Sequence, residues 1–254
     1  MKTVAVIPVF DHGESAGAVA HALRGYGLPV ILVDDGSGEA TARTLAALAA
    51  ETAGADGGGP AVTLVSHAEN RGKGAAVMTG VRAARAHGAS HVLQVDADGQ
   101  HDLDAVPRFL EAAARHPAAV IAAYPRYDAS VPRGRLYARY LTHAWVWINT
   151  LSRRINDSMC GLRVYPLAAV LPLLPALDRA RRMDFDTEIL VRLDWAGVEI
   201  INMPVAVRYP EGNVSRFRPW RDNARISAMH ARLFFGMIPR LPGLLMRHIR
   251  REGR

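Results

Sequence analysis

Two aspartates separated by one alanine follow an apolar run in the middle of the chain. The segment reads Asp96-Ala97-Asp98-Gly99-Gln100-His101 and comes directly after residues 91–95. Two carboxylates at a strand end can face one hard cation, because Mg²⁺ and Mn²⁺ take oxygen ligands and also bind substrate phosphates. Such a metal would neutralise the charge on a departing diphosphate. An Asx-rich turn that caps the next helix is the alternative, and the pair alone does not decide between them.

Two further polar clusters come earlier in the chain. Asp34-Asp35-Gly36-Ser37 could accept hydrogen bonds from a nucleobase or ribose, but the same residues also favour a turn followed by a helix start. Asn70-Arg71-Gly72-Lys73-Gly74-Ala75 places two glycines and a lysine at a predicted helix start, which suits an anion. Its spacing fits neither a P-loop nor the glycine fingerprint of dinucleotide-binding folds. Each cluster alone is a weak indication of function.

The predicted elements bring these clusters together. Short apolar runs alternate with helical patterns, which predicts an α/β fold with a mostly parallel sheet and helices on both faces. The predicted strands are residues 3–8, 30–33, 62–66, 91–95 and 118–123, and the predicted helices are residues 15–24, 40–52, 74–86 and 103–115. The three polar clusters follow the second, third and fourth strands, at the carboxyl edge where such sheets bind ligands.

The second half of the chain changes character. It is predicted to contain helices over residues 137–151, 184–195 and 222–237 and a strand over residues 198–207. No internal repeat or clear linker is visible. We therefore expect one domain over residues 1–210, followed by a basic helical extension over residues 211–254 that packs on or near it.

Composition narrows the function classes. The 254 residues are 50% hydrophobic and carry a formal net charge of +7, which suits a folded domain with an anionic partner. No nucleic-acid-binding module is recognisable, so nucleic acid is not expected as a partner. The single cysteine, Cys160, excludes an internal disulfide and fits a reducing cytoplasm. Without a signal peptide or a membrane-spanning run, we expect a cytoplasmic protein with at most peripheral contact at the inner face of a membrane.

Longer segments around the clusters resemble the family 2 glycosyltransferases, in particular the dolichol-phosphate mannosyltransferase and polyprenyl-phosphate glycosyltransferase branch. The resemblance extends over residues 4–209 and rests on residues 7–10, 33–37, 70–75, 94–101, 157–163 and 185–188. The metal segment matches closely, including its Gln and His. Asp11 and His12 replace the Asn and Glu that usually follow the first motif.

The resemblance implies a single Rossmann-like domain of the glycosyltransferase A (GT-A) type with an α-rich C-terminal extension. It also implies transfer of a sugar from a UDP- or GDP-linked donor, with inversion at the anomeric carbon and a divalent ion, Mg²⁺ or Mn²⁺. The implied donor site contains Pro8, Phe10, Asp34, Asp35, Lys73 and Asp96, and the implied metal ligands are Asp96, Asp98 and Gln100.

The need for a protein base depends on the acceptor. A hydroxyl acceptor must lose a proton, and Asp186, with Glu188 as its neighbour, is our candidate for the catalytic base. Both acids equally suit a helix N-terminus, where they would interact with the helix dipole. A polyprenyl phosphate or another membrane-linked phosphate is already ionised and needs no base.

Arginines in the second half are candidates for binding phosphates. Arg133, Arg135 and Arg139 could orient an acceptor phosphate through charge-assisted hydrogen bonds, or they could form a solvated basic face. Arg216 and Arg218 could close over the donor diphosphate as a mobile loop, or they could belong to a basic surface loop.

Two other function classes stay open. A nucleotidyltransferase has a related fold but carries a basic glycine-rich loop after the first strand, where this chain reads Val9-Phe10-Asp11-His12-Gly13. A non-catalytic membrane-surface module on a degenerate transferase fold is the third class. The intact pair of Asp96 and Asp98 argues against it, so we predict a metal-dependent glycosyltransferase.

Overall fold

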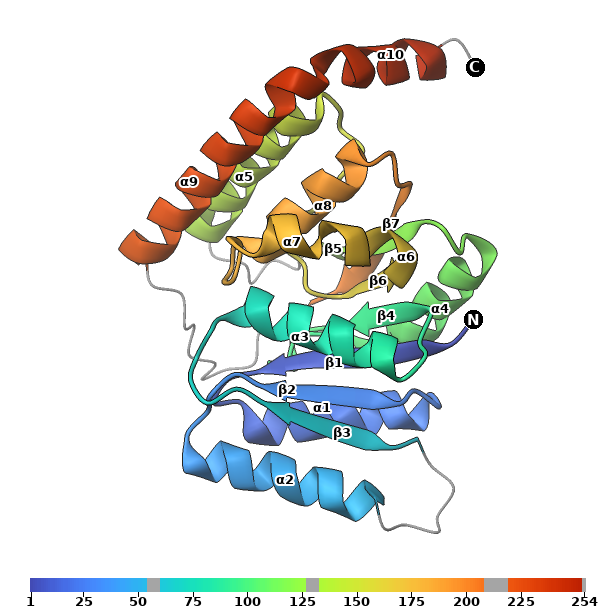
Figure 1. The fold of residues 1–254 in the computed structure, drawn as a ribbon, viewed down its shortest axis with the longest axis vertical. Coiled ribbons are helices and arrows are strands. Elements are labelled where there is room, and N and C mark those ends of the chain that lie inside the picture. The colour runs from blue at the N-terminus through green and yellow to red at the C-terminus, as the bar shows by residue number, and fades with distance from the viewer. Residues whose placement is uncertain (54–59, 127–132, 208–218, 253–254) are drawn as a thin grey trace.

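The computed structural model describes residues 1–53, 60–126, 133–207 and 219–252. Within these residues one sheet of seven strands runs through the centre of the protein (Figure 1). The strands are β1 Thr3–Val9, β2 Val30–Asp34, β3 Val62–Ser66, β4 His91–Gln94, β5 Val120–Arg126, β6 Arg163–Pro166 and β7 Ile200–Ala206. Their spatial order is β3-β2-β1-β4-β6-β5-β7, and all neighbours are parallel except that β6 is antiparallel to β4 and β5. The predicted mostly parallel sheet is confirmed.

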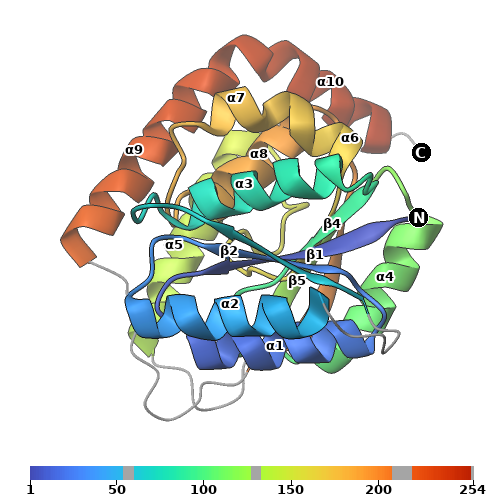
Figure 2. The ribbon, with the colours of Figure 1, turned by 60° about the horizontal axis from the view of Figure 1, so that its bottom comes forward.

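Helices cover both faces of this sheet, as predicted. They are α1 Gly13–Gly25, α2 Glu39–Ala53, α3 Lys73–Ala86, α4 Val106–Arg115, α5 Arg133–Thr150, α6 Leu167–Val170, α7 Leu174–Leu177, α8 Phe185–Trp195, α9 Pro219–Met237 and α10 Leu241–Glu252. Three short 3₁₀ turns, η1 Leu103–Ala105, η2 Leu171–Leu173 and η3 Ile238–Arg240, lie among them. Figure 2 shows α1, α2 and α4 on one face and α3, α6, α7 and α8 on the other.

The strands are apolar on both sides, because each face of the sheet packs against helices. On β1, Val4 and Val6 belong to the core under α3 and α8, whereas Ala5 and Ile7 belong to the core under α1 and α4. This alternation along one strand follows from the period of two in side-chain direction. The polar residues are thereby left to the loops at the strand ends.

The last helices pack on the second half of the sheet domain. α9 lies beside α5 and also contacts α8, and its Met229 and Leu233 are buried in the core on that side (Figure 1). The boundary between residues 1–210 and 211–254 stays a prediction. No helix in the described segments is long and apolar enough to cross a membrane.

The main difference from the predicted elements is β6. This four-residue strand contains Arg163 and ends at Pro166, so it shows neither a long apolar run nor an alternating pattern. It nevertheless lies between β4 and β5, with Leu93 paired to Val164. The short helices α6 and α7 were also not predicted, and α10 lies within the predicted helical extension but was not predicted as a separate helix. Other boundaries shift by a few residues; α5, for example, begins at Arg133 instead of residue 137.

Candidate active site

The predicted metal segment lies at the carboxyl edge of the sheet, directly after β4. The N–H of Val95 still donates to the Val6 carbonyl of β1 at 3.1 Å, so Asp96 and Asp98 begin where the sheet ends. The N–H of Gln100 donates to Asp98 Oδ1 at 3.1 Å and closes the turn between them. The Asp96 side chain is 21% exposed, but its Oδ1, which faces Lys73, is shielded from water.

Lys73 connects this segment to the start of another helix. Its Nζ lies 2.6 Å from Asp96 Oδ1 and 2.6 Å from Asp186 Oδ2, so the first residue of α3 joins the end of β4 to the first turn of α8. Burial alone would lower the pKa of Lys73, but Asp186 and Asp96 outweigh it and raise this pKa above its ordinary value. Lys73 is therefore a fixed positive charge between two carboxylates.

Asp186 is held from three sides. Besides Lys73, Gln94 Nε2 donates to its Oδ1 at 2.8 Å, and the guanidinium of Arg163 lies 3.9 Å from the same oxygen. The Asp186 residue is only 3% exposed. The structure thus brings the candidate base Asp186 to the predicted donor residues Lys73 and Asp96, which sequence spacing alone did not show.

Arg163 is a buried cation beneath Asp186 that the sequence analysis did not assign. It is fully buried on β6, and it donates to the carbonyls of Asp186 at 2.6 Å and Ser158 at 2.7 Å and to the hydroxyl of Tyr165 at 3.0 Å. Burial opposes its charge, but Tyr165 and Asp186 outweigh this effect and raise the pKa of Arg163. The sequence feature that could have indicated this role is the position of Arg163 at the end of the family-like segment 157–163.

Gly161 and His101 also contact the Asp96 carboxylate. A Cβ built at Gly161 would overlap the Asp96 carboxyl group, so this position needs the close approach that only glycine permits. His101 Nε2 lies 3.9 Å from Asp96 Oδ2, and its Nδ1 lies 3.9 Å from Cys160 Sγ. Burial would lower the pKa of His101, but Cys160 and Asp96 raise it to about 10. Asp96 therefore has positive charge on both sides.

The arrangement fits a divalent cation. Burial and, after it, the negative charge of Asp96 raise the pKa of Asp98, and a cation between the two aspartates would oppose both effects. Among the residues that the structure describes, no three His, Cys, Asp or Glu side chains converge as a closed metal site. Water and substrate phosphates would then complete the coordination, which is the mode that Mg²⁺ and Mn²⁺ favour.

Asp35 occupies the anion position that the glycine-rich segment predicted. Its Oδ1 accepts from the N–H of Arg71 at 3.0 Å and lies 2.7 Å from Nδ1 of His67, and its Oδ2 accepts from the N–H of Gly72 at 2.7 Å. The carboxylate thus lies at the N-terminal end of α3, where the helix dipole favours negative charge. Asp35 is 2% exposed, so in this structure it orders the loop before Lys73.

The remaining predicted donor residues lie at the ends of β1 and β2. Pro8 pairs in register with Val33, and Phe10 follows β1 and is partly exposed. Asp34 accepts from the N–H of Ser37 at 3.0 Å. Asp11 links the two loops, because its Oδ1 accepts from the N–H of Gly38 at 2.8 Å. The loop after β2 lies against the loop before α3, because a Cβ at Gly36 would meet the backbone of Glu69 and Asn70. The contact of these residues with a nucleotide stays a prediction.

Comparison with known proteins identifies the family. The model for "Glycosyl transferase family 2" matches residues 5–168, which include the β1, β2, β4 and Lys73 segments. The chain belongs to glycosyl transferase family 2. The polyprenol monophosphomannose synthase of Mycolicibacterium smegmatis is 29% identical over 234 residues, which cover 85% of this chain and 80% of that protein.

Other family 2 relatives and solved structures agree with this assignment. A dolichyl-phosphate beta-glucosyltransferase of Dictyostelium discoideum is 24% identical over 216 residues, and the match covers 81% of this chain but only 62% of that longer protein. The glucosyl-3-phosphoglycerate synthase of Mycobacterium tuberculosis, solved with Mn²⁺ and UDP-glucose, shares the fold with a TM-score of 0.59. That structure is 17% identical and is matched over 94% of this chain and 78% of its own. The GT-A fold is therefore confirmed.

Glu188 lies apart from the active-site residues of this family 2 protein. It is fully buried on α8; its Oε1 accepts from Arg192 at 2.7 Å and its Oε2 from Arg232 of α9 at 2.8 Å. Both carboxylate oxygens are thus used to join α8 to its own next turn and to α9. This placement supports a structural role, and the predicted catalytic role of Glu188 finds no contact to support it.

The predicted acceptor arginines are only partly described. Arg139 forms a bidentate ion pair with the buried Asp157, with Nη2 at 2.7 Å from Oδ1, so part of its donor capacity is used within the protein. Arg133 and Arg135 belong to the first turn of α5, but their side chains lie outside the described part of the structure, as do the whole residues Arg216 and Arg218. Their roles stay predictions.

Proposed function

We propose that this family 2 protein is a metal-dependent, inverting glycosyltransferase that moves a sugar from a nucleoside-diphosphate sugar to an acceptor. The observation that supports it most directly is Lys73, held between Asp96 and Asp186 at the carboxyl edge of the sheet. A positive charge there would attract the donor diphosphate. It would also stabilise the negative charge that develops on the diphosphate in the transition state, and this lowers the barrier to transfer.

The proposed metal ligands are Asp96, Asp98 and the side chain of Gln100, with Mg²⁺ or Mn²⁺ as the ion. When bound, the metal would supply charge neutralisation at the donor diphosphate. Asp96 would face both the metal and Lys73 and would thereby position the two positive charges relative to one another. Pro8, Phe10 and Asp34 would line the nucleotide side, next to Asp35.

We propose a polyprenyl phosphate or another membrane-linked phosphate as the acceptor. Relatives are named for dolichyl, polyprenol and undecaprenyl phosphates, which supports this class. The paired helices α5 and α9 expose large apolar side chains, with Tyr140 63%, Leu141 64% and Phe235 68% exposed. Aromatic and aliphatic residues on such a surface suit the interfacial region of a bilayer. The proposed location is therefore peripheral to a membrane.

Asp186 has two alternative roles that depend on the acceptor. An ionised lipid phosphate needs no base, so Asp186 would then only hold Lys73 in place. A hydroxyl acceptor needs a proton acceptor, and Asp186 would have to exchange its contact with Lys73 for one with the substrate. The first role requires no rearrangement and is the one we favour.

Calorimetry with UDP- and GDP-sugars, in Mn²⁺ and in EDTA, tests the proposal. We expect one donor series to bind in Mn²⁺ and to lose at least about tenfold in affinity in EDTA. Asp98→Asn should lose the Mn²⁺ effect, because half of the carboxylate pair is removed. Glu111→Gln, an exposed acid on α4, is the matched control and should bind like the wild type. Absence of binding to every donor in both conditions would refute the function.

A further inference from the structure

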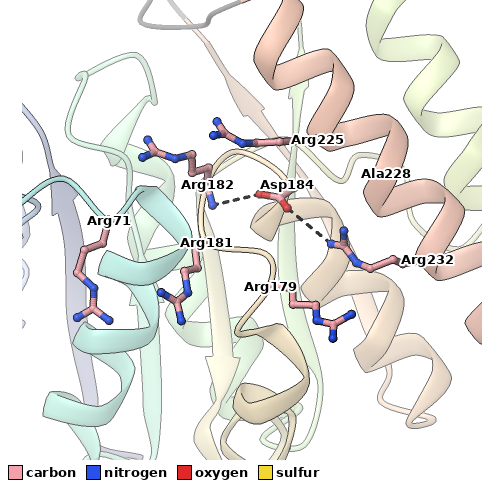
Figure 3. Close-up of a pocket in the computed structure, with 8 residues that line it drawn as sticks. All are labelled: Arg71, Arg179, Arg181, Arg182, Asp184, Arg225, Ala228 and Arg232. Atoms are coloured by element: carbon pink, nitrogen blue, oxygen red, sulfur yellow. Dashed lines mark hydrogen bonds and ion pairs between the residues drawn. The ribbon is translucent and has the colours of Figure 1, made fainter.

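Six arginines line one cavity beside the active site, where three segments of the chain meet. The cavity has a volume of about 300 Å³, and the only acidic side chain in its lining among the described residues is Asp184 (Figure 3). One arginine comes from the loop before α3, three from the segment before α8 and two from α9; they are Arg71, Arg179, Arg181, Arg182, Arg225 and Arg232, called the arginine pocket below.

Three of these six guanidinium groups are paired with carboxylates. The pairs are Arg181 with Asp178 at 2.7 Å, Arg225 with Asp222 at 3.3 Å and Arg232 with Glu188 at 2.8 Å. In the first two pairs the arginine side chain is 45% exposed, so water screens much of their attraction. The pair of Arg232 is the most buried, because Glu188 is fully enclosed.

The other three guanidinium groups have no carboxylate partner in the described structure. Arg182 Nη1 donates to the side-chain oxygen of Asn70 at 2.9 Å, which is a neutral acceptor. The exposed side chains of Arg71 and Arg179 form no hydrogen bond or ion pair with any residue that the structure describes. Three guanidinium groups around one cavity are thus left without an ion pair to a described carboxylate.

One buried hydrogen-bond donor in the wall of the arginine pocket also has no acceptor. The Nε of Arg232 is shielded from water and has no acceptor within the described residues. Asp184 does not fill this need, because its carboxylate lies 3.8 Å from Arg232 Nη2 and instead accepts from the N–H of Arg182 at 3.1 Å. A buried N–H without an acceptor costs roughly 1–3 kcal/mol, which a bound anion would recover by accepting from it or by drawing the guanidinium into the cavity.

We propose that the arginine pocket binds a phosphoryl group, as a phosphate monoester or a diphosphate, at a site separate from the metal segment. Guanidinium groups present planar pairs of N–H donors that match phosphate oxygens, and they keep their charge at all physiological pH values. Two or three uncompensated positive charges match the charge of a phosphate dianion or a diphosphate. A carboxylate carries only one negative charge and would leave the excess uncompensated.

A solvated basic surface is the competing explanation. On such a surface, arginines point outward and apart, since like charges repel. Here residues from three segments line one cavity, and Arg71 in the loop before α3 and Arg232 on α9 lie on opposite sides of the 179–184 segment (Figure 3). A nucleic acid would need an extended basic stripe or aromatic stacking platforms, and no aromatic residue lines this cavity.

The first test measures pyrophosphate binding by calorimetry in EDTA, which removes any contribution of a divalent metal at Asp96 and Asp98. We expect the wild type to bind pyrophosphate and the double variant Arg71→Gln/Arg179→Gln to bind at least about tenfold more weakly. Neither substitution removes a contact within the protein, so folding should be unaffected. Arg43→Gln/Arg115→Gln removes the same charge from two exposed arginines on α2 and α4 and should bind like the wild type.

The second test asks where the phosphoryl group comes from. Vesicles of phosphatidylcholine alone are compared in flotation with vesicles that contain phosphatidic acid, a lipid phosphate monoester. If the protein floats with the phosphatidic acid vesicles and several-fold less of the double variant does so, the ligand is a lipid headgroup. If the protein binds pyrophosphate but does not float with these vesicles, the ligand is a soluble phosphate. Equal pyrophosphate affinity of the wild type and the double variant would overturn the pocket. Asp98→Asn should still bind pyrophosphate in EDTA. The experiments can therefore refute the transferase proposal and the arginine-pocket proposal separately.

Discussion

Two neighbouring regions of the protein differ in how their charges are compensated. The first, the carboxylate cluster, contains Asp96, Asp98 and Asp186, with Lys73 and Arg163 beside Asp186 and with Lys73 and His101 beside Asp96. The second is the arginine pocket, where three guanidinium groups lack a carboxylate. The two regions meet at the start of α3, which contributes Lys73 to one and is preceded by Arg71 of the other.

The difference shows how each region depends on ligands. In the carboxylate cluster, cations lie beside Asp96 and Asp186, and Asp98 is the acid that has no ion pair among the described residues. In the arginine pocket the described carboxylates supply only part of the counter-charge, and the proposed anion would supply the rest. A metal in the first region and a phosphoryl group in the second would therefore each stabilise the folded protein.

The largest effect is expected from removing the buried cation of the carboxylate cluster. Arg163→Met should lower the free energy of unfolding by about 3–5 kcal/mol, because it leaves Asp186 and two buried carbonyl groups without their donor. Urea denaturation followed by circular dichroism measures this loss. Arg115→Met, a change at an exposed surface pair, should stay within about 0.5 kcal/mol of the wild type. A loss below about 1 kcal/mol for Arg163→Met would contradict the role of this cation.

The two acids of α8 test whether the regions have separate roles. Asp186→Asn should reduce the rate of sugar transfer about 100-fold, because Lys73 loses one of its two anchors next to the donor. Glu188→Gln should leave this rate within about twofold but lower the free energy of unfolding by roughly 1–3 kcal/mol, since Arg192 and Arg232 lose a charged acceptor. Steady-state kinetics and denaturation of both variants give the comparison. The reverse pattern would move the catalytic role to Glu188.

A smaller effect is expected from one added methyl group. Gly161→Ala should weaken Mn²⁺-dependent donor binding about tenfold, because the new Cβ occupies the place of the Asp96 carboxyl group and must displace it. Gly17→Ala on α1 is the control: its Cβ meets open space, and the protein should gain roughly 0.4–1 kcal/mol of stability. Unchanged donor affinity in Gly161→Ala would show that the position of Asp96 is not critical.

Local patterns in the sequence predicted which residues lie at the carboxyl edge of the sheet. Asp35, Lys73 and Asp96 each follow a strand whose apolar run is visible in the sequence, and parallel strands must end at one edge. The position of each residue is therefore determined by a few neighbouring positions. The sequence also indicated an anion site at the start of α3 for a ligand; that the protein's own Asp35 lies there depends on how the two loops fold together.

Other features depend on contacts between distant parts of the chain. β6 carries a buried arginine and no periodic pattern, and it forms only because β4 and β5 leave a place between them. The arginine pocket combines residues that are up to 161 positions apart, from Arg71 to Arg232. Glu188 looked like a partner of Asp186 because the two are close in sequence, but a helix turns residues two positions apart to different sides.

The place of β6 also has a consequence for synthesis on the ribosome. β6 is the sole neighbour that joins the strands β1 to β4 to the pair β5 and β7 in the described sheet. A nascent chain that has emerged only as far as β5 can assemble the first four strands, but its β4 edge stays open until residues 163–166 arrive. Because Gly161 arrives just before that strand, the half-made protein holds Asp96 without the glycine that packs against its carboxyl group, and Asp186 follows later still. The enzyme thus completes its active site late in its own translation.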